Sequence, residues 1–296
     1  MSVLVDIRDV SKIYNPGENE VRALDHVSVS IEEGEYVAII GQSGSGKSTL
    51  MNLLGCLDMP SEGEYFLHGK NVLELDDDEL SDIRNQEIGF IFQGFNLIAN
   101  LTAFENVELP LIYRGVAKAK RRILSEKALE KVGLGNRIDH RPSEMSGGQQ
   151  QRVAIARAIA QAPPVILADE PTGNLDSRST WEIMDVLEKL HDEGRTVIII
   201  THNNEIAERA DRVINIRDGH IESDSRDDAL KNSSVAKKKT MDRPAEQENE
   251  GHDEMHDKDE REETPEETHE KTDNVGKVYF SMEEEIISQE KEDTEE

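Results

Sequence analysis

The chain has 296 residues, of which 35% are hydrophobic and 33% are charged, and its formal net charge is −29. This composition indicates a folded part joined to a polar appendage. The negative charge argues against nucleic acid as a partner, because phosphate backbones bind basic surfaces. The single cysteine, Cys56, excludes an internal disulfide, fits a reducing compartment and is expected to be a buried hydrophobic residue. Since no apolar run approaches the ~18 residues of a membrane span and no N-terminal signal segment is present, we expect a soluble, cytoplasmic protein.

The N-terminal segment, residues 3–33, alternates apolar and polar side chains, which predicts short strands with turns at Pro16-Gly17 and Glu33-Gly34. Tyr14 ends one of these strands. It has the character of an ordinary surface aromatic residue. Because a glycine-rich loop follows it in the chain, its ring is also a candidate to stack on a purine base.

A run of β-forming residues from Tyr36 to Ile40 gives way to a glycine-rich loop and then to a helical pattern from Lys47. The loop matches G-x-x-x-x-G-K-[ST] in the strand–loop–helix context that the motif requires, which a chance match in a flexible linker would not provide. Its glycines let backbone N–H groups face phosphate oxygens at the positive end of a helix. Lys47 would reach the β- and γ-phosphates, and the Ser48 hydroxyl would bind Mg²⁺. The expected nucleotide contacts are Gly41, Ser43, Gly44, Ser45, Gly46, Lys47, Ser48 and Thr49.

The middle of the chain continues the alternation of strands and helices. Residues 63–72 predict a hairpin that turns at His68-Gly69, and residues 74–86 predict a polar helix with acidic residues near its first turn. A buried strand begins at Ile88 and ends at Gln93, which could be simply a surface glutamine at a strand end. Helical periodicity then extends from residue 102 to residue 141.

Residues 145–161 predict a helix that begins with Gly147-Gly148, a second arrangement suited to anions. A continuous apolar strand over 165–170 then delivers Asp169 and Glu170 at its tip. Acids at the carboxyl end of a parallel strand lie where ligands bind in open α/β sheets.

The remaining pattern predicts a helix over 177–191, a buried strand over 196–202 that ends in His202, a helix over 203–210 and a hairpin turning on Asp218-Gly219. Strands that alternate with helices in this way indicate an α/β domain with a mostly parallel sheet, which we expect to span residues 1–222.

Residues 223–296 contain 26 acidic and 11 basic residues and almost no apolar ones, so we expect an acidic, largely disordered tail. One segment, 277–289, places Tyr279, Met282 and Ile286 on one helix face. It is either a helix that folds on docking or a chance apolar cluster.

Together these motifs resemble those of ATP-binding-cassette (ABC) ATPases over residues 1 to about 222. The succession of SGGQ, QQRVAIARA and LADEPTGNLD is far more specific than a phosphate loop alone. Met145 stands where the family often has Leu, and Gly173-Asn174 where many members have Ser-Ala; neither replaces a group that contacts nucleotide or metal. The matching positions are Gly41–Ser48 (Walker A), Gln93 (Q-loop), Ser146–Gln149 (signature), Val165–Glu170 (Walker B), Asn174–Asp176 (D-loop), His202 (switch histidine) and Tyr14 (adenine-stacking aromatic).

The resemblance implies a P-loop NTPase fold of the ABC type, with an N-terminal antiparallel β subdomain and a helical subdomain at about residues 94–160. It implies ATP and Mg²⁺ as cofactors, with the metal bound by Ser48, Gln93 and Asp169. Glu170 would be the general base, His202 would contact the γ-phosphate, and Gln93 would bind the metal or the attacking water. A salt-bridged acid and a buried structural histidine are the alternatives for Glu170 and His202.

In this family two domains pair head to tail, and each signature segment closes over the ATP of the other. The resemblance therefore implies a homodimer, and it adds Ser146, Gly147, Gly148, Gln149 and Asp176 to the expected nucleotide-binding residues. Within the family, the motifs resemble the group that drives lipoprotein release and the export of macrolides or antimicrobial peptides. Membership would imply a separate integral-membrane permease that holds the ATPase at the inner face of the plasma membrane. A cell-division relative is close in motif.

Two other classes of function stay open. One is a soluble ABC ATPase that acts on ribosomes or DNA. Such members usually carry two cassettes or long insertions, whereas only 104 residues separate Gly41 from Met145 here. The other is a regulatory module that switches without turnover, against which the intact Glu170 and His202 argue.

Overall fold

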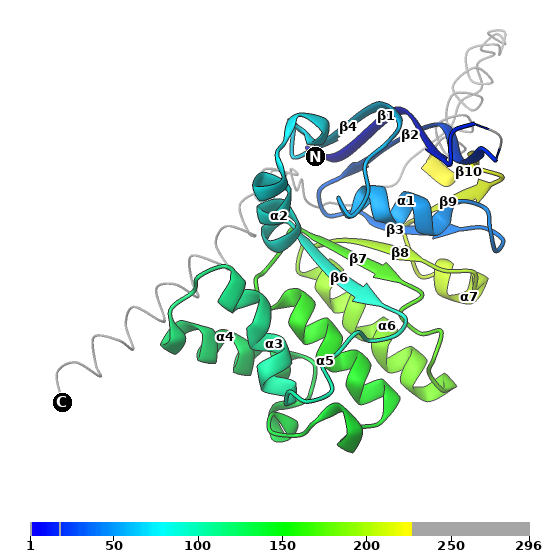
Figure 1. Cartoon of the computed structure of the whole chain (residues 1–296). Coiled ribbons are helices and arrows are strands. Elements are labelled where there is room, and N and C mark those ends of the chain that lie inside the picture. Colours follow the sequence, from blue (N-terminus) through cyan, green and yellow to red (C-terminus); the bar gives the residue numbers. More distant parts are fainter. Residues whose placement is uncertain (1, 18, 227–296) are drawn as a thin grey trace, which may run out of the picture.

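A computed structural model describes residues 2–17 and 19–226. This part of the chain contains two β-sheets, and helices lie on both faces of the larger one (Figure 1). The α/β fold that the motifs imply, with an antiparallel sheet beside a mostly parallel one, is confirmed. Of the expected acidic tail, residues 227–296, with the cluster at 277–289, lie outside the described residues. Within those residues, no helix combines the length and the apolar composition that crossing a bilayer would require.

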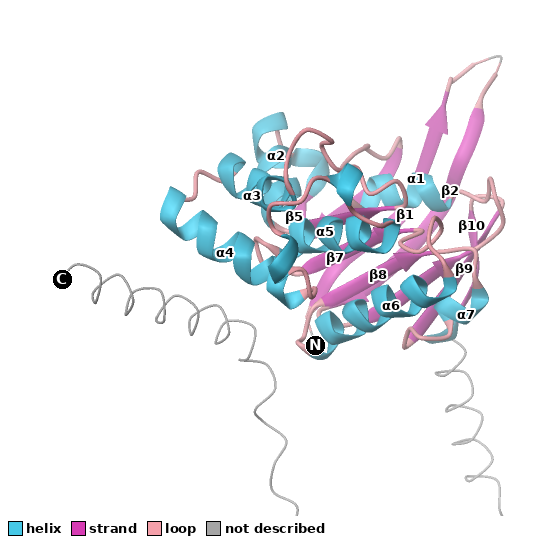
Figure 2. Ribbon diagram, turned by 90° about the horizontal axis from the view of Figure 1, so that it is seen from below, coloured by secondary structure: helices cyan, strands magenta, loops and turns pink. Residues whose placement is uncertain are grey.

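The antiparallel sheet has the strand order β2-β1-β4-β5. Its two long strands, β1 and β2, continue as a two-stranded arm beyond the body of the domain (Figure 2). Register shifts interrupt their pairing, and Asp9 and His26 have left-handed φ angles of 52°. These bulges break the two-residue alternation, which is why the sequence predicted several short strands. The strands are β1 Val3–Tyr14, β2 Val21–Glu32, β4 Glu62–Leu67 and β5 Lys70–Asn71.

The second sheet has the order β10-β9-β3-β8-β7-β6, and all its strands are parallel except β10 at the edge. The buried strands are continuous apolar runs, as a sheet covered on both faces requires. Their carboxyl ends meet at one edge, where the expected site residues follow. The strands are β3 Tyr36–Ile40, β6 Ile88–Phe92, β7 Val165–Asp169, β8 Thr196–Ile200, β9 Arg212–Arg217 and β10 His220–Asp224.

Five of the seven α-helices in the described part of the chain begin at a residue whose side chain caps them. Asp76, Thr102 and Ser146 each form a capping box with a Glu or Gln three residues later, which satisfies the first free N–H groups of the helix. The last predicted helix is shorter than expected and ends at Ala207. The helices are α1 Lys47–Leu54, α2 Asp77–Gln86, α3 Ala103–Tyr113, α4 Lys118–Lys131, α5 Gly147–Ile159, α6 Ser177–Asp192 and α7 Asn204–Ala207, with 3₁₀ turns η1 Val72–Glu74, η2 Gly135–Arg137 and η3 Pro142–Glu144.

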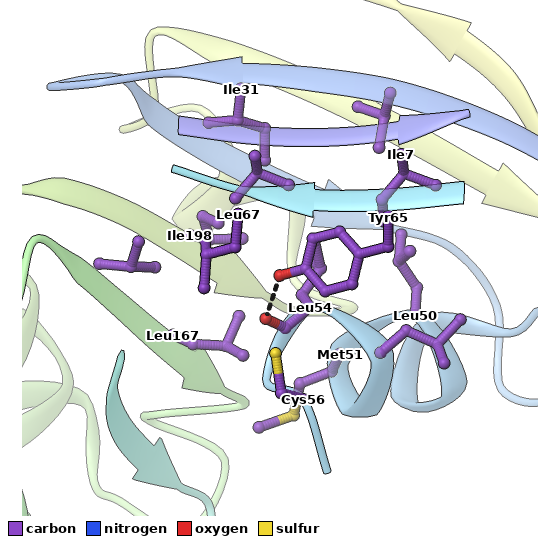
Figure 3. Packing of buried hydrophobic residues seen from close by; sticks show 14 of the residues in the cluster. Ile7, Ile31, Leu50, Met51, Leu54, Cys56, Tyr65, Leu67, Leu167 and Ile198 are labelled. Carbon is purple, nitrogen blue, oxygen red and sulfur yellow. Dashed lines mark hydrogen bonds between the residues drawn. The ribbon is translucent and has the colours of Figure 1, made fainter. Parts of the chain in front are cut away.

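The parallel sheet separates two apolar cores. On one face, Leu167 and Ile198 pack with α1 and the antiparallel sheet; on the other, Ile166 and Ile199 pack with α3, α4, α5 and α6. Tyr65 lies in the first core and donates a hydrogen bond to the Leu54 carbonyl (2.8 Å; Figure 3). The phosphate-loop helix α1 is thereby fixed between the two sheets.

Cys56 belongs to the same core and is 3% exposed. Burial raises the pKa of its thiol to about 11, so it stays protonated at neutral pH. It is a buried structural residue, as the sequence predicted.

The folded part continues past residue 222, where the sequence placed its end. Strand β10 runs to Asp224, whose carboxylate accepts two hydrogen bonds from the guanidinium of Arg212 (2.9 and 2.6 Å). Arg212 also donates to Glu35 (3.0 Å), and Arg226 forms an ion pair with Glu32. The acidic composition of residues 223–296 suggested a disordered tail, but Asp224 pairs with the buried Arg212 and so belongs to the folded domain.

Candidate active site

The phosphate loop connects β3 to α1 and lies between two hollows. One, of about 790 Å³, is lined by Gln42 and Ser43 of the loop, by His202 and by the β9–β10 hairpin. The other, of about 360 Å³, runs along Gly46–Thr49 and reaches Asp218 and Gly219. Both open at the carboxyl edge of the parallel sheet, where a ligand is expected in such a fold.

The glycines of the loop are required by close packing. A side chain at Gly41 would place its Cβ 2.2 Å from the Ile216 carbonyl oxygen, and one at Gly46 would lie 2.5 Å from the Ala23 oxygen. Gly46 also has a φ of 105°, which residues with a side chain rarely adopt. The N–H of Gly219 donates to the Ser45 carbonyl (3.0 Å), so β2 and the last hairpin both support the loop.

Two polar groups of the loop face its interior. Lys47 is 9% exposed, and its Nζ donates to the carbonyl oxygens of Gly41 (2.8 Å) and Gln42 (2.9 Å). The Ser45 Oγ is buried and has no hydrogen-bond partner among the described residues. The Lys47 ammonium, which bonds its own loop, and the unpaired Ser45 hydroxyl are suited to bind an anion that enters between them.

The acids at the end of β7 differ in environment. Burial and the neighbouring Glu170 raise the pKa of Asp169, while Lys47 opposes the rise. Glu170 has a left-handed φ of 43°, and its Oε1 lies 2.6 Å from Nδ1 of His202. The Thr201 hydroxyl donates to the other carboxylate oxygen (3.4 Å). The structure therefore brings together Glu170 and His202, 32 residues apart in sequence.

Tyr14 lies at the end of β1 and is 36% exposed. Its hydroxyl donates to Asp58 (3.0 Å), and the Lys12 ammonium lies 5.1 Å from its ring centroid. Partial burial, then the bond to Asp58, raise the pKa of the phenol, and a hydrogen bond with Thr49 opposes this effect. Tyr14 thus stands beside the first turn of α1, and its contact with a base remains a prediction.

The signature residues form a second group, at the start of α5. Ser146 caps this helix and Gln149 completes its capping box. Gly148 packs so closely that a Cβ would lie 2.7 Å from the Ser179 Oγ, and Gly147 faces Leu175. Asp176 caps α6 through the N–H (3.0 Å) and hydroxyl (2.8 Å) of Ser179, and these bonds lower its pKa. Within the described chain, the hydrogen bonds of Ser146, Gln149 and Asp176 are all local.

Gln93 follows β6 and pairs with Asn174, which the sequence placed in the D-loop but not in the site. The Asn174 Nδ2 donates to the backbone carbonyl oxygen of Gln93 (2.9 Å), and the side-chain Nε2 of Gln93 donates to the Asn174 Oδ1 (3.5 Å). The two residues are 81 positions apart, and no sequence pattern links them.

The residues expected to bind Mg²⁺ suit that ion. Ser48, Gln93 and Asp169 offer hydroxyl, amide and carboxylate oxygens, and Mg²⁺ prefers oxygen ligands. No group of three His, Cys, Asp or Glu side chains in the described part of the chain could hold a metal. One carboxylate is sufficient where substrate phosphates complete the coordination, so the donor set fits.

Comparison with known proteins adds three findings. The family model described as "ABC transporter" matches residues 24–173. A macrolide export ATP-binding/permease protein MacB of Hyphomonas neptunium is 57% identical over 222 residues, which are 75% of this chain and 34% of that protein. An uncharacterized ABC transporter ATP-binding protein of Thermotoga maritima is 52% identical over 222 residues, 75% of this chain and 95% of that one. The chain thus spans about a third of the MacB relative.

Two solved structures resemble the described fold. The ATP-binding cassette MJ0796, as a dimer in a post-hydrolysis state with ADP and Pi, is 47% identical with a TM-score of 0.69. A second dimeric structure of MJ0796, described as a bacterial ABC transporter cassette, is 48% identical with a TM-score of 0.70. Each match covers 75% of this chain and 97% of the other.

Proposed function

The chain belongs to the ABC transporter family, and we propose that it is an ATP-hydrolysing subunit that drives a separate membrane permease. The observation that carries the hydrolytic part is the carboxylate of Glu170, held by His202 at the sheet edge beside Asp169 and the phosphate loop. The proposal of a permease rests on the relatives. Among them, the Thermotoga protein, 95% of which is covered by the match, is named an ABC transporter ATP-binding protein.

Glu170 would act as the general base on the attacking water. Its position one residue after β7 and its contact with His202 Nδ1 fix the direction of the carboxylate. A positioned base contributes roughly 10²- to 10⁴-fold to such a reaction. His202 would contact the γ-phosphate, and its link to Glu170 would couple the base to the presence of ATP.

Lys47 and the loop amides would bind the phosphates. Because Lys47 Nζ now donates to two loop carbonyls, phosphate binding would exchange these neutral acceptors for anionic oxygens, which attract the ammonium more strongly. When bound, Mg²⁺ would neutralise charge on the phosphates, with Ser48, Asp169 and Gln93 as its protein ligands. Tyr14 would stack on the adenine.

The second group of residues would act on a partner's nucleotide. Ser146, Gly147 and Gly148 lie at the positive end of a 13-residue helix, a position suited to phosphate. We place them over the ATP of a second copy, in a head-to-tail homodimer, and the dimeric MJ0796 structures support this arrangement. Both sites of such a dimer would carry every motif.

The transported substrate is proposed from names alone. Relatives named for macrolide export support a role in the group that exports macrolides or peptides or releases lipoproteins. The ATPase would then lie at the cytoplasmic face of the plasma membrane, bound to its permease. A cell-division ABC ATPase is the alternative.

The substitution Glu170→Gln tests the hydrolytic role, because the amide keeps the shape of the side chain but cannot take the proton of water. We expect unchanged ATP affinity, an ATP-dependent stable dimer and a kcat lowered by roughly 10²- to 10⁴-fold. Glu126→Gln is the control, since Glu126 forms an ion pair with the exposed Arg122 on α4. Hydrolysis by Glu170→Gln at close to the wild-type rate would show that Glu170 is not the base.

A further inference from the structure

The contact between Gln93 and Asn174 determines which way the glutamine amide faces. The backbone carbonyl oxygen of Gln93 can only accept a hydrogen bond, so the Asn174 group 2.9 Å from it must be Nδ2. The Asn174 Oδ1 then points to the Gln93 side chain, and as an acceptor it requires Nε2 rather than Oε1 at 3.5 Å. One backbone carbonyl therefore sets both amides in turn.

Gly173 provides the space for this arrangement. A Cβ at Gly173 would lie 2.6 Å from Nε2, 3.1 Å from Cδ and 3.3 Å from Cγ of Gln93. The glutamine side chain therefore lies flat on the Gly173 backbone, immediately before Asn174. Any larger residue at this position would displace the amide.

The backbone on both sides of Gln93 is also fixed, by the signature helix α5. Gln151 donates to the carbonyls of Phe92 (3.4 Å) and Pro171 (2.8 Å). Arg157 donates to those of Phe95 (3.0 Å) and Asn96 (2.5 Å), and both of these residues have left-handed φ angles. With its backbone fixed, Gln93 is adjusted mainly by rotation of its side chain.

We propose that Asn174 is a positioning residue that selects the orientation of the Gln93 amide in which Oε1, not Nε2, is presented to Mg²⁺. An amide presents either an oxygen or two N–H donors, and only the oxygen can bind a cation. By accepting from Nε2, Asn174 ties the donor end to the D-loop and leaves the oxygen for the metal. The inference rests on the proposed function, in which Gln93 is a ligand of the Mg²⁺ bound with ATP.

Asn174→Ala should leave the fold intact and free the amide to rotate. We expect the affinity for ATP measured in EDTA to stay unchanged, and the gain in affinity on adding Mg²⁺ to fall by roughly two- to tenfold, the value of one hydrogen bond. In the nucleotide-free protein, the side-chain NH₂ signals of Gln93 in ¹H–¹⁵N NMR should shift. Asn100→Ala, in the exposed loop before α3, is the matched control and should change neither measurement.

A double-mutant cycle with Gln93→Ala separates positioning from a general structural effect. If Asn174 acts through Gln93, then Asn174→Ala should have no further effect on the Mg²⁺-dependent gain once Gln93 is Ala. An equal loss with and without Mg²⁺, unmoved Gln93 signals, or an undiminished effect in the Gln93→Ala background would each overturn the proposal.

The cycle also distinguishes a failure of the positioning role of Asn174 from a failure of the proposed function. If Gln93→Ala alone leaves the Mg²⁺-dependent gain intact, Gln93 is not a metal ligand, and the assignment on which the proposal rests is wrong. If Gln93→Ala removes the gain and Asn174→Ala does not change it, only the positioning role is wrong.

Discussion

Replacing Asp224 by Asn tests the ion pair that fastens the last strand to the domain. The Asp224 side chain is 10% exposed and that of Arg212 is 8% exposed, so neither charge is well solvated. The substitution keeps the size of the side chain and removes its charge. Arg212 would retain Glu35 (3.0 Å) and the Ser30 carbonyl (2.8 Å) as acceptors.

The expected cost follows from these contacts. Removing one partner of a buried ion pair costs about 3–5 kcal/mol when the other charge is left alone, and one hydrogen bond to a charged group is worth about 1.5–3 kcal/mol. Because Glu35 remains, we expect a loss of about 2–4 kcal/mol in the free energy of unfolding. For a domain of this size the loss corresponds to a decrease of about 4–16 °C in Tm.

The loss should depend on pH in a defined direction. Burial alone would raise the pKa of Asp224, but the bonds from Arg212 and from the Arg226 N–H outweigh burial and lower it. A carboxyl whose pKa is lower in the folded protein stabilises it above the unfolded value of about 3.9, and this contribution is lost as the pH falls through the folded pKa. The difference between wild type and Asp224→Asn should therefore be constant near pH 7 and should shrink below about pH 4.

Urea unfolding followed by circular dichroism measures the effect. Asp218→Asn in the same hairpin is the control, because Asp218 is 90% exposed, lies 3.7 Å from an exposed Arg217, and has a left-handed φ that Asn tolerates. We expect a change within about 0.5 kcal/mol for this control. Equal stability of Asp224→Asn and Asp218→Asn at pH 7 would refute the reasoning.

Three other outcomes are expected. Lys47→Ala should weaken ATP binding in calorimetry by roughly 10- to 150-fold, because it removes a charge-assisted contact worth about 1.5–3 kcal/mol, and a loss under twofold would contradict its role. Ser146→Arg should bind ATP normally yet fail to dimerise in light scattering and to hydrolyse ATP, and normal activity would exclude the head-to-tail dimer. A chain ending at Arg226 should hydrolyse ATP within about twofold of the full chain, whereas one ending at Glu222 should be less stable because it lacks Asp224. If the chain ending at Arg226 is folded but does not hydrolyse ATP, the tail is needed.

The sequence predicted those parts of the fold that depend on local pattern. The runs at 36–40, 165–169 and 196–200 are buried strands because a sheet covered on both faces requires continuous apolar residues. The hairpin at Asp218-Gly219 forms as expected, because its turn residues favour the left-handed backbone that the turn needs.

Features set by distant contacts could not be predicted. The pairing of Gln93 with Asn174 joins segments 81 residues apart, and the role of Asp224 depends on the buried Arg212 of another strand. The position of Lys47 Nζ on its own loop is likewise a property of the folded loop and not of the motif. Glu170, Asp169 and His202 were predictable as candidates because each lies at or just past the end of a buried strand, and parallel strands bring such ends together.

The support of the phosphate loop by the end of the fold has a consequence for the order of synthesis. Strand β3 pairs with β8 and β9, and the loop packs against Ile216 and Gly219, all made long after Gly41 leaves the ribosome. At translation rates of 5–20 residues per second, the loop waits roughly 10–35 s for these partners. A nascent chain arrested before Ile216 would therefore contain the whole phosphate-binding motif without the contacts that shape it.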